Sequence, residues 1–196
     1  MIIAVVNTKG GTAKTTSAVF LACAFAQRGY STTVIDLDAQ GSASDWADRA
    51  EMAGESLPFS VEVTNLRRLP RLAERHRGPE DAVIIDTPPG DPDSIDTAIK
   101  VADFVLVPSQ ASPIEIARVW ETLPALQNTP HGILITAARL GTRSLEMATK
   151  QLEEHEVSVF TTRIPIREGI RDTFGELPSR TYGYEDVANE ILEVLA

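Results

Sequence analysis

The sequence predicts a three-layer α/β domain, in which a mostly parallel, twisted β-sheet carries helices on both faces. Short β-branched segments alternate with helical patterns along most of the 196 residues, and this alternation is typical of right-handed βαβ units. The short segments are almost continuously apolar, as expected for strands that are buried on both faces. A chain of this length can bury one sizeable core and is short for two, so we expect one domain over residues 1–196.

Six apolar segments are predicted to be strands of this sheet. They are residues 2–6, 32–36, 82–86, 103–107, 132–136 and 157–161. Residues 59–63, with the sequence FSVEV, alternate between apolar and polar side chains, which favours a half-exposed edge strand.

Helices are expected between the strands and at the end of the chain. The helical patterns cover residues 15–28, 94–101, 113–127 and 143–155. From Tyr184 onward an amphipathic pattern places Val187 and Ile191 on one face. Its polar face is acidic, whereas a helix on a membrane surface would carry Lys and Arg, so packing against the domain is favoured.

Composition and charge exclude several classes of protein. The formal net charge of −10 argues against a surface coated with positive charge. No apolar run approaches the roughly 20 residues of a membrane span, and no basic leader precedes the first strand, so we expect a cytoplasmic protein without a membrane partner. The single cysteine, Cys23, leaves no disulfide within the chain and no cysteine pair for zinc or an iron–sulfur cluster.

Residues 7–16, NTKGGTAKTT, stand between a predicted strand and a predicted helix, as a phosphate-binding loop does. Such a loop needs inward-pointing N–H groups, a helix N-terminus and small side chains. Lys14 would reach the β- and γ-phosphates, Thr15 would place its hydroxyl on Mg²⁺, and Thr16 would contact the α-phosphate. The structural alternative is a turn that merely contains Gly-Gly.

The loop departs from the standard pattern G-x-x-x-x-G-K-[ST] at two positions, Thr8 and Ala13. With Lys9 beside Gly10 and Gly11, it resembles the deviant Walker A loop of the ParA/MinD family of ATPases, whose first lysine is the signature residue. Ala13 departs even from that pattern. An alanine there costs about 1 kcal/mol or more if the position needs a positive φ, and little if the backbone is already helical.

Two further predicted strands end in segments that resemble this family. Residues 34–46, VIDLDAQGSASDW, resemble its D-x-D-x-Q switch segment. The resemblance implies that Asp38 positions the attacking water and that Asp36 approaches the metal through water, with Gln40 in the same loop. The alternative is a polar turn that caps the next helix.

Residues 81–91, DAVIIDTPPGD, have the form of a Walker B strand followed by a stiff turn. The resemblance implies that Asp86 holds Mg²⁺ through a water. Residues 102–116 and 162–192 also resemble the family, and in relatives the loop after the last long strand borders the adenine. The implied site is catalytic at Lys9, Lys14 and Asp38, metal-binding at Thr15, Asp36 and Asp86, and nucleotide-binding at Lys9, Gly10, Gly11, Thr12, Ala13, Lys14, Thr15, Thr16, Pro165 and Ile166.

The resemblance implies a ParA-like ATPase that uses ATP and Mg²⁺, with small plasmid-type partition ATPases as the nearest match because no extension precedes the loop. Such proteins form a homodimer on ATP, with Lys9 acting across the interface on the partner's phosphates. The dimer binds nonspecific DNA at the nucleoid, and a ParB-like adaptor protein stimulates slow hydrolysis to drive partition of a plasmid or chromosome, or the positioning of another cargo.

Three other functions remain open from the sequence. A MinD-like membrane-associated regulator of division would need a basic C-terminal helix. A relative of the nitrogenase iron protein would need bridging cysteines. A binding module without hydrolysis fits poorly, since Lys9, Lys14, Asp38 and Asp86 are all present.

Two groups of basic residues are candidates for the DNA contact. Residues 67–77 hold five arginines against one glutamate, although a solvated helix face is the more ordinary reading of such a run. The rival group is Arg139, Arg143, Lys150, Arg163, Arg167 and Arg171.

Overall fold

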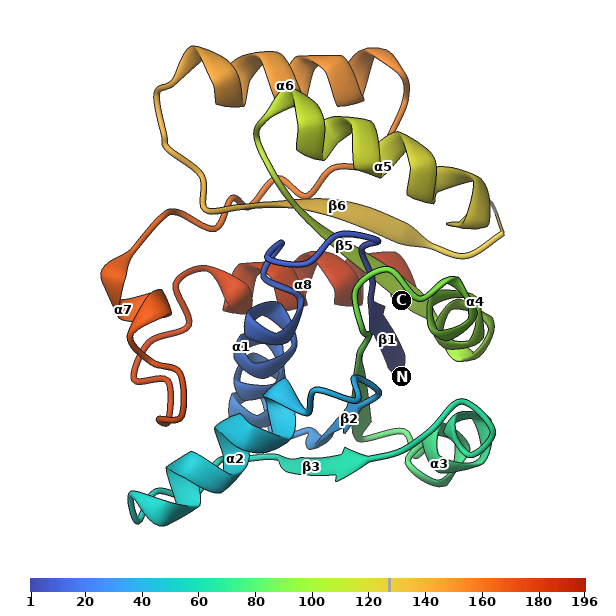
Figure 1. Cartoon of the computed structure of the whole chain (residues 1–196), viewed down its shortest axis with the longest axis vertical. Helices are drawn as coiled ribbons and strands as arrows, with labels where there is room; N and C mark the ends of the chain where they lie inside the picture. Colours follow the sequence, from blue (N-terminus) through green and yellow to red (C-terminus); the bar gives the residue numbers. More distant parts are fainter. Residues whose placement is uncertain (127) are drawn as a thin grey trace.

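Six parallel strands form the central sheet of the computed structural model, which describes residues 1–126 and 128–196 (Figure 1). Their order across the sheet is β3-β2-β4-β1-β5-β6, so β1 lies between β4 and β5. The strands are β1 (Ile2–Val5), β2 (Ser31–Asp36), β3 (Ser60–Val63), β4 (Asp81–Asp86), β5 (Phe104–Gln110) and β6 (His131–Thr136).

Helices cover both faces of this sheet. One face carries α1 (Lys14–Gln27), α2 (Ser42–Met52) and α8 (Tyr184–Leu195). The other carries α3 (Leu69–Arg75), α4 (Pro92–Val101), α5 (Pro113–Leu126) and α6 (Arg143–Glu154). A short helix, α7 (Glu168–Arg171), precedes α8 (Figure 1).

Alternation along the strands divides the apolar core into two layers. Ile3 and Val5 of β1 pack into the core under α1 and α8, whereas Ile2 and Ala4 pack into the core under α4 and α5. Successive side chains of a strand point to opposite faces, so a strand inside a three-layer domain must be apolar at every position. The predicted three-layer α/β architecture is confirmed.

Helix α1 is the most deeply buried helix of the first layer. Small and apolar side chains from Ala18 to Phe25 are all buried between the sheet and its neighbours. At its start the Ser17 hydroxyl lies 2.9 Å from the Tyr184 hydroxyl of α8, so two buried polar groups satisfy each other. The helix that follows the phosphate loop is therefore fixed on all sides.

The predicted elements agree with the structure except at one strand. Residues 59–63 contain the edge strand β3, and the four predicted internal helices and the C-terminal helix are present, although residue 127 of the predicted helix 113–127 lies outside the described residues. The prediction of a strand over residues 157–161 is wrong, because this segment makes only an isolated bridge between Val159 and Ile133.

A side chain of α8 accepts the backbone hydrogen bonds that would otherwise extend the 157–161 segment as a strand. The backbone N–H groups of Thr161 and Thr162 donate to the Glu190 carboxylate of α8, at 2.7 and 2.9 Å, instead of continuing a ladder with β6. Charge-assisted bonds of this kind compete well with a neutral ladder bond.

In the part of the chain that the structure describes, no helix is both long and apolar enough to cross a bilayer.

Candidate functional site

The carboxyl ends of three neighbouring strands bring most of the predicted site residues together. β1 leads into the loop of residues 7–13, while β2 ends at Asp36 and β4 ends at Asp86. In the strand register Asp86 lies beside both Val5 and Asp36. Ligands of parallel α/β sheets bind beyond this edge. Helix α1 begins here, and the unpaired N–H groups of a helix N-terminus favour an anion.

The Lys14 side chain is buried within the loop, with only 7% of the residue exposed. Its ammonium donates a hydrogen bond of 2.7 Å to the backbone carbonyl oxygen of Lys9, which closes the loop around it. Burial lowers the pKa of Lys14, while the nearby carboxylates of Asp86 and Asp38 act in the opposite direction. The Lys14 ammonium is therefore a buried group whose hydrogen bond goes to a neutral backbone oxygen.

Thr15 and Asp86 form a second pair beneath the loop. The Thr15 hydroxyl donates to Oδ2 of Asp86 at 2.7 Å, and the other carboxylate oxygen, Oδ1, is buried without a partner among the described residues. Burial is the main cause that raises the pKa of Asp86 to about 7, and the Thr15 hydrogen bond opposes it. A hydroxyl beside an unsatisfied carboxylate oxygen is a donor set that fits Mg²⁺, which takes one or two carboxylates and completes its shell with water and phosphate.

The backbone at Ala13 is left-handed, with φ 71° and ψ 32°. Gly11, two residues earlier, also has a positive φ of 77°. Position 13 therefore has the conformation that glycine adopts without strain, and an alanine there costs about 1–2 kcal/mol. The strained residue is held because its carbonyl oxygen accepts the first hydrogen bond of α1, from the Ser17 N–H at 2.8 Å.

A cavity of about 290 Å³ lies directly over the loop. Its lining combines the loop with residues that follow β2 and β4, namely Gly10, Gly11, Ala13, Lys14, Thr15, Thr16, Asp38, Ser42, Thr87 and Pro89. Backbone N–H groups, a buried ammonium and small side chains meet there, which is the surrounding that a phosphate chain needs. Thr12 is buried and does not line this cavity.

A second cavity of about 420 Å³ adjoins the first, since both are lined by Gly11, Ala13 and Thr16. Its walls are mainly apolar and include the predicted Pro165 and Ile166. The remaining walls come from elements far apart in the sequence, among them Trp46, Gln110, Thr136, Ile164, Ile170, Phe174 and Tyr184. The two cavities make one groove with a charged end and an apolar end, as a nucleotide requires.

Trp46 was not predicted from the sequence as a residue of this groove. The Trp46 indole donates to the carbonyl oxygen of Glu176 at 2.8 Å and meets the Phe174 ring edge-on, with 5.3 Å between centroids. These contacts hold the segment before α8 against α2, and with it one wall of the groove. No local signal marks them, because they join segments 130 residues apart.

The two aspartates after β2 have different positions. Asp36 is fully buried and accepts hydrogen bonds from the Ser44 N–H and hydroxyl, at 2.9 and 2.7 Å, and from the Asp38 N–H at 3.1 Å. It therefore holds the first turn of α2 and does not line either part of the groove. Asp38 lines the phosphate-sized cavity and accepts the Gln40 N–H at 2.9 Å.

Lys9 is turned away from the cavity over its own loop. Its ammonium forms an ion pair with Glu115 in the first turn of α5; the Lys9 side chain is 43% exposed and that of Glu115 only 7%. Lys9 instead lines a separate hollow of about 280 Å³ with Thr8, Ile114, Arg118 and Glu121. Glu115 was not predicted as a site residue, because nothing in the sequence near it shows that it faces the loop.

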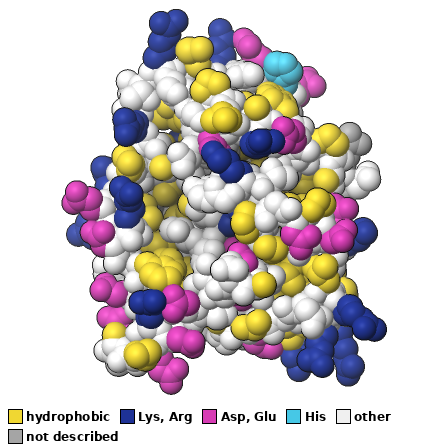
Figure 2. Space-filling view, viewed as in Figure 1, with side chains coloured by type: hydrophobic (Ala, Val, Ile, Leu, Met, Phe, Trp, Pro, Cys, Tyr) yellow, Lys and Arg dark blue, Asp and Glu magenta, His cyan; other side chains and the backbone are white. Residues whose placement is uncertain are grey.

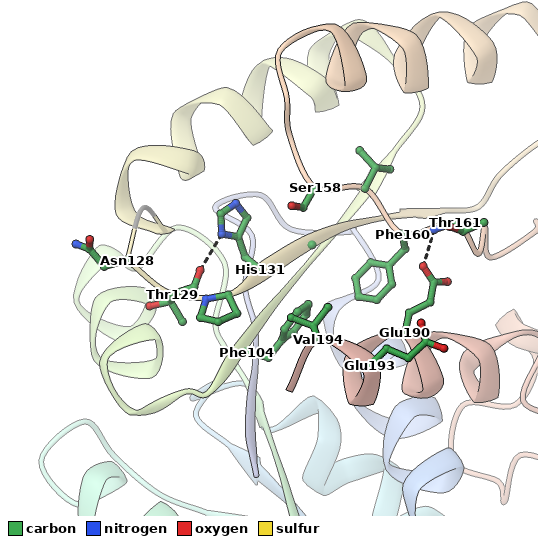
Figure 3. Close-up of a pocket in the computed structure, with 13 residues that line it drawn as sticks. Phe104, Asn128, Thr129, His131, Ser158, Phe160, Thr161, Glu190, Glu193 and Val194 are labelled. Carbon is green, nitrogen blue, oxygen red and sulfur yellow. Dashed lines mark hydrogen bonds between the residues drawn. The ribbon is translucent and has the colours of Figure 1, made fainter. Parts of the chain in front are cut away.

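A larger cavity, of about 720 Å³, lies at the opposite end of the sheet (Figure 3). Phe104 and His131, the first residues of β5 and β6, line it with Phe160, and the Glu190 carboxylate accepts the Thr161 N–H. His131 lies 2.9 Å from the Thr129 carbonyl oxygen through Nδ1. Because it borders the amino ends of the strands, and its His131 and Glu190 bond to neighbouring residues, we do not assign it to the candidate site.

Comparison with known proteins agrees with the geometry. Residues 3–177 match the family model described as the CobQ/CobB/MinD/ParA nucleotide binding domain. Over 169 residues the chain is 37% identical to the maintenance of carboxysome distribution protein A of Gloeobacter kilaueensis, covering 81% of this chain and 74% of that protein. It is 28% identical to the chromosome-partitioning ATPase Soj of Thermus thermophilus, covering 97% of this chain and 94% of Soj.

Solved structures share the fold at lower identity. An McdA variant from Cyanothece in complex with ATP has a TM-score of 0.77 at 18% identity, covering 98% of this chain and 96% of that one. MinD from Pyrococcus horikoshii with Mg-ADP has 0.75 at 17%, covering 100% and 97%. The pNOB8 ParA bound to nonspecific DNA has 0.67 at 16%, covering 99% and 98%. One fold thus serves proteins with different partners.

Proposed function

The chain belongs to the CobQ/CobB/MinD/ParA family of nucleotide-binding domains, and from this premise we propose that residues 1–196 form one ParA-like ATPase domain. Mg-ATP drives its dimerisation, the dimer binds nonspecific DNA, and an adaptor protein stimulates hydrolysis. The observation that carries the proposal is the groove, in which Lys14, Thr15 and Asp86 lie beneath a phosphate-sized cavity that continues into an apolar one.

ATP fits the groove in one orientation only. The phosphates occupy the cavity over the loop, where Lys14 neutralises the β- and γ-phosphates and the helix N-terminus contributes its N–H groups. The adenine lies in the apolar cavity against Pro165 and Ile166. Thr15, and Asp86 through a water, would hold the Mg²⁺, which would neutralise charge on the phosphate oxygens.

Asp38 is the residue that orders the attacking water. It lines the phosphate cavity, is half-buried, and leads directly into the loop before α2. Asp36 supports it from below, because its carboxylate accepts the Asp38 N–H and both donors of Ser44. We therefore give Asp36 a positioning role in addition to its approach to the metal through water.

Lys9 serves the phosphates of a second copy of the chain. Its ammonium does not line the cavity over its own loop and instead contacts Glu115 of α5. A compact ammonium that enters from outside can neutralise charge that develops during phosphoryl transfer. The contact with Glu115 must be released when the partner binds.

The cargo is a plasmid, a chromosome or a protein assembly. The names of the two relatives support both kinds, since one is a carboxysome distribution protein and the other a chromosome-partitioning ATPase. Neither is a reason to place the protein at a membrane, and α8 carries no Lys or Arg on its polar face.

Retention on mixed-sequence duplex DNA, with and without Mg-ATP, tests the function. The protein should be retained only in the presence of Mg-ATP and not with ADP. Lys14→Ala should abolish retention because that variant no longer binds the nucleotide. DNA retention that is independent of nucleotide, or absent under all conditions, would contradict the proposal.

Mixing two inactive variants tests the action of Lys9 across the interface. Lys9→Ala and Asp38→Ala should each lack hydrolysis alone. In a mixed dimer, the Lys9→Ala subunit keeps its own Asp38 and receives Lys9 from its partner, so one site is complete and ATPase activity returns in part. If Lys9 acted within its own chain, the mixture would stay as inactive as its components.

A further inference from the structure

A hollow of about 390 Å³ lies between the edge strand β3 and helix α3. We call it the arginine hollow, because Arg68, Arg71 and Arg75 line it together with Glu62, Val63, Thr64 and Leu72. Arg67, Arg68, Arg71 and Arg75 are all exposed. The dark blue group at the lower right of Figure 2, over α3, shows how closely the basic side chains gather there.

The arginine hollow keeps its positive charge, because few carboxylates neutralise it. Among the described residues that line it, Glu62 alone is acidic, and it pairs with Arg75 at 3.4 Å and with His76 at 2.8 Å. Arg67, Arg68 and Arg71 form no salt bridge with any described residue. Several exposed basic side chains elsewhere are paired, namely Arg49 with Asp45, Arg77 with Asp103, Arg118 with Glu121 and Lys150 with Glu154.

The rival basic group does not form one patch in the structure. Arg167 and Arg171 line the apolar part of the nucleotide groove. Lys150 is paired with Glu154, and Arg163 lies close enough to Glu153 and Glu190 for both to affect its pKa. Arg139 and Arg143 are left as exposed charges of that group. In a chain with a net charge of −10, the arginine hollow is therefore the stronger site for an anion.

We propose that the arginine hollow binds the backbone phosphates of double-stranded DNA; this assignment rests on the proposed DNA-binding function and names the surface that carries it. Arg68 and Arg75 are separated by about 10 Å along the helix axis at 1.5 Å per residue. Along one DNA strand, phosphates advance about 3.4 Å each, so the row spans roughly three nucleotides.

The lining explains why the contact is insensitive to sequence and favours duplex DNA. No aromatic side chain is among the described residues that line the hollow, so it offers no platform for unpaired bases. The Asn65 side chain beside it accepts the Arg68 N–H at 3.2 Å. The hollow otherwise offers the guanidinium groups and the Thr64 hydroxyl, which are donors of the kind that position a phosphate backbone.

The test measures binding of the full-length, ATP-loaded protein to a labelled mixed-sequence duplex over a range of salt concentrations. Arg68→Gln/Arg71→Gln should bind about tenfold more weakly at low salt, and its slope of log K against log salt should be shallower by about 2. Arg68→Lys/Arg71→Lys keeps the charge and should keep the slope. Affinity for a fluorescent ATP analogue should be unchanged in both variants, which shows that they are folded.

Arg139→Gln/Arg143→Gln removes the same charge from the rival group and is the matched control. If this control loses the salt slope and the arginine-hollow variant does not, the assignment is overturned while the proposed function stands. If wild-type protein with ATP does not bind the duplex at all, both fail. If poly-glutamate displaces the wild-type protein as well as duplex DNA does at equal charge, the hollow accepts acidic polypeptides and the DNA assignment is wrong.

Discussion

The two halves of the phosphate loop place their lysines in opposite surroundings. In the inner half, residues 12–16, Lys14 is buried, bonds the carbonyl oxygen of Lys9 and lies near Asp86. In the outer half, residues 8–11, the Lys9 ammonium is partly exposed and bonds Glu115 of another element. The inner half is complete within one chain, whereas the outer half directs its charge away from its own cavity.

The two lysines differ in the free energy that it would cost to move each side chain from its present contacts. Lys14 has lost its water, and removing it would leave the buried carboxylate of Asp86 without a nearby cation. The Lys9 end of its ion pair is partly in solvent, so the ammonium itself gives up little on moving, whereas the carboxylate of Glu115 is only 7% exposed and bears the cost of losing its cation. One loop therefore combines a fixed lysine with one that is partly solvated and can exchange partners.

Alanine substitutions of the two lysines should separate the halves most strongly. Lys14→Ala removes charge-assisted hydrogen bonds to two phosphates, at about 1.5–3 kcal/mol each, so ATP affinity should fall by about 1000-fold. Lys9→Ala should stay within about tenfold of wild type in ATP affinity, because its ammonium lies outside the cavity. Titration of each variant with a fluorescent ATP analogue measures both. Equal losses would mean that the halves do not differ.

Ala13→Gly tests the strain at the junction with the inner half. Removing the strain of the left-handed alanine should raise the free energy of unfolding by about 1–2 kcal/mol. The greater freedom of glycine in the unfolded chain should lower it by about 0.4–1 kcal/mol. The net gain of about 1 kcal/mol should raise the Tm of this chain by about 2–4 °C in calorimetry.

A matched glycine substitution controls for the effect of glycine itself. Ala47 lies within α2, where the backbone is right-handed, so Ala47→Gly should lower stability by about 1 kcal/mol. If both substitutions lowered the Tm, the left-handed conformation at position 13 would not be a source of strain.

Glu115→Gln tests the outer half and should have the smallest effect. The amide keeps the shape of the side chain but holds the Lys9 ammonium less strongly, so Lys9 is released more easily. ATP-dependent dimers should become more stable by up to about 1 kcal/mol, or about fivefold in Kd. Sedimentation of wild type and variant with a non-hydrolysable ATP analogue measures this. Weaker dimers would show that Glu115 helps assembly instead of competing with it.

Local patterns predicted the strand ends and the loop, because a buried parallel strand and a helix start have their causes in adjacent residues. The positions of Lys14, Thr15 and Asp86 follow from those elements. What the sequence could not show depends on tertiary contacts: Glu115 beneath Lys9, and the Glu190 carboxylate that takes the N–H groups of the predicted strand 157–161. The conformation of Ala13 likewise depends on how the loop closes around the buried ammonium.

The placement of Trp46 gives this protein an optical reporter of its own site. Trp46 is a wall of the apolar cavity, whereas Trp120, the second tryptophan, lies on α5 with its ring 5.0 Å from that of His155. Emission from the first should change when a base stacks in the groove, and emission from the second should not. A Trp120→Phe variant would therefore allow nucleotide entry to be followed in real time by stopped-flow spectroscopy, without any attached dye.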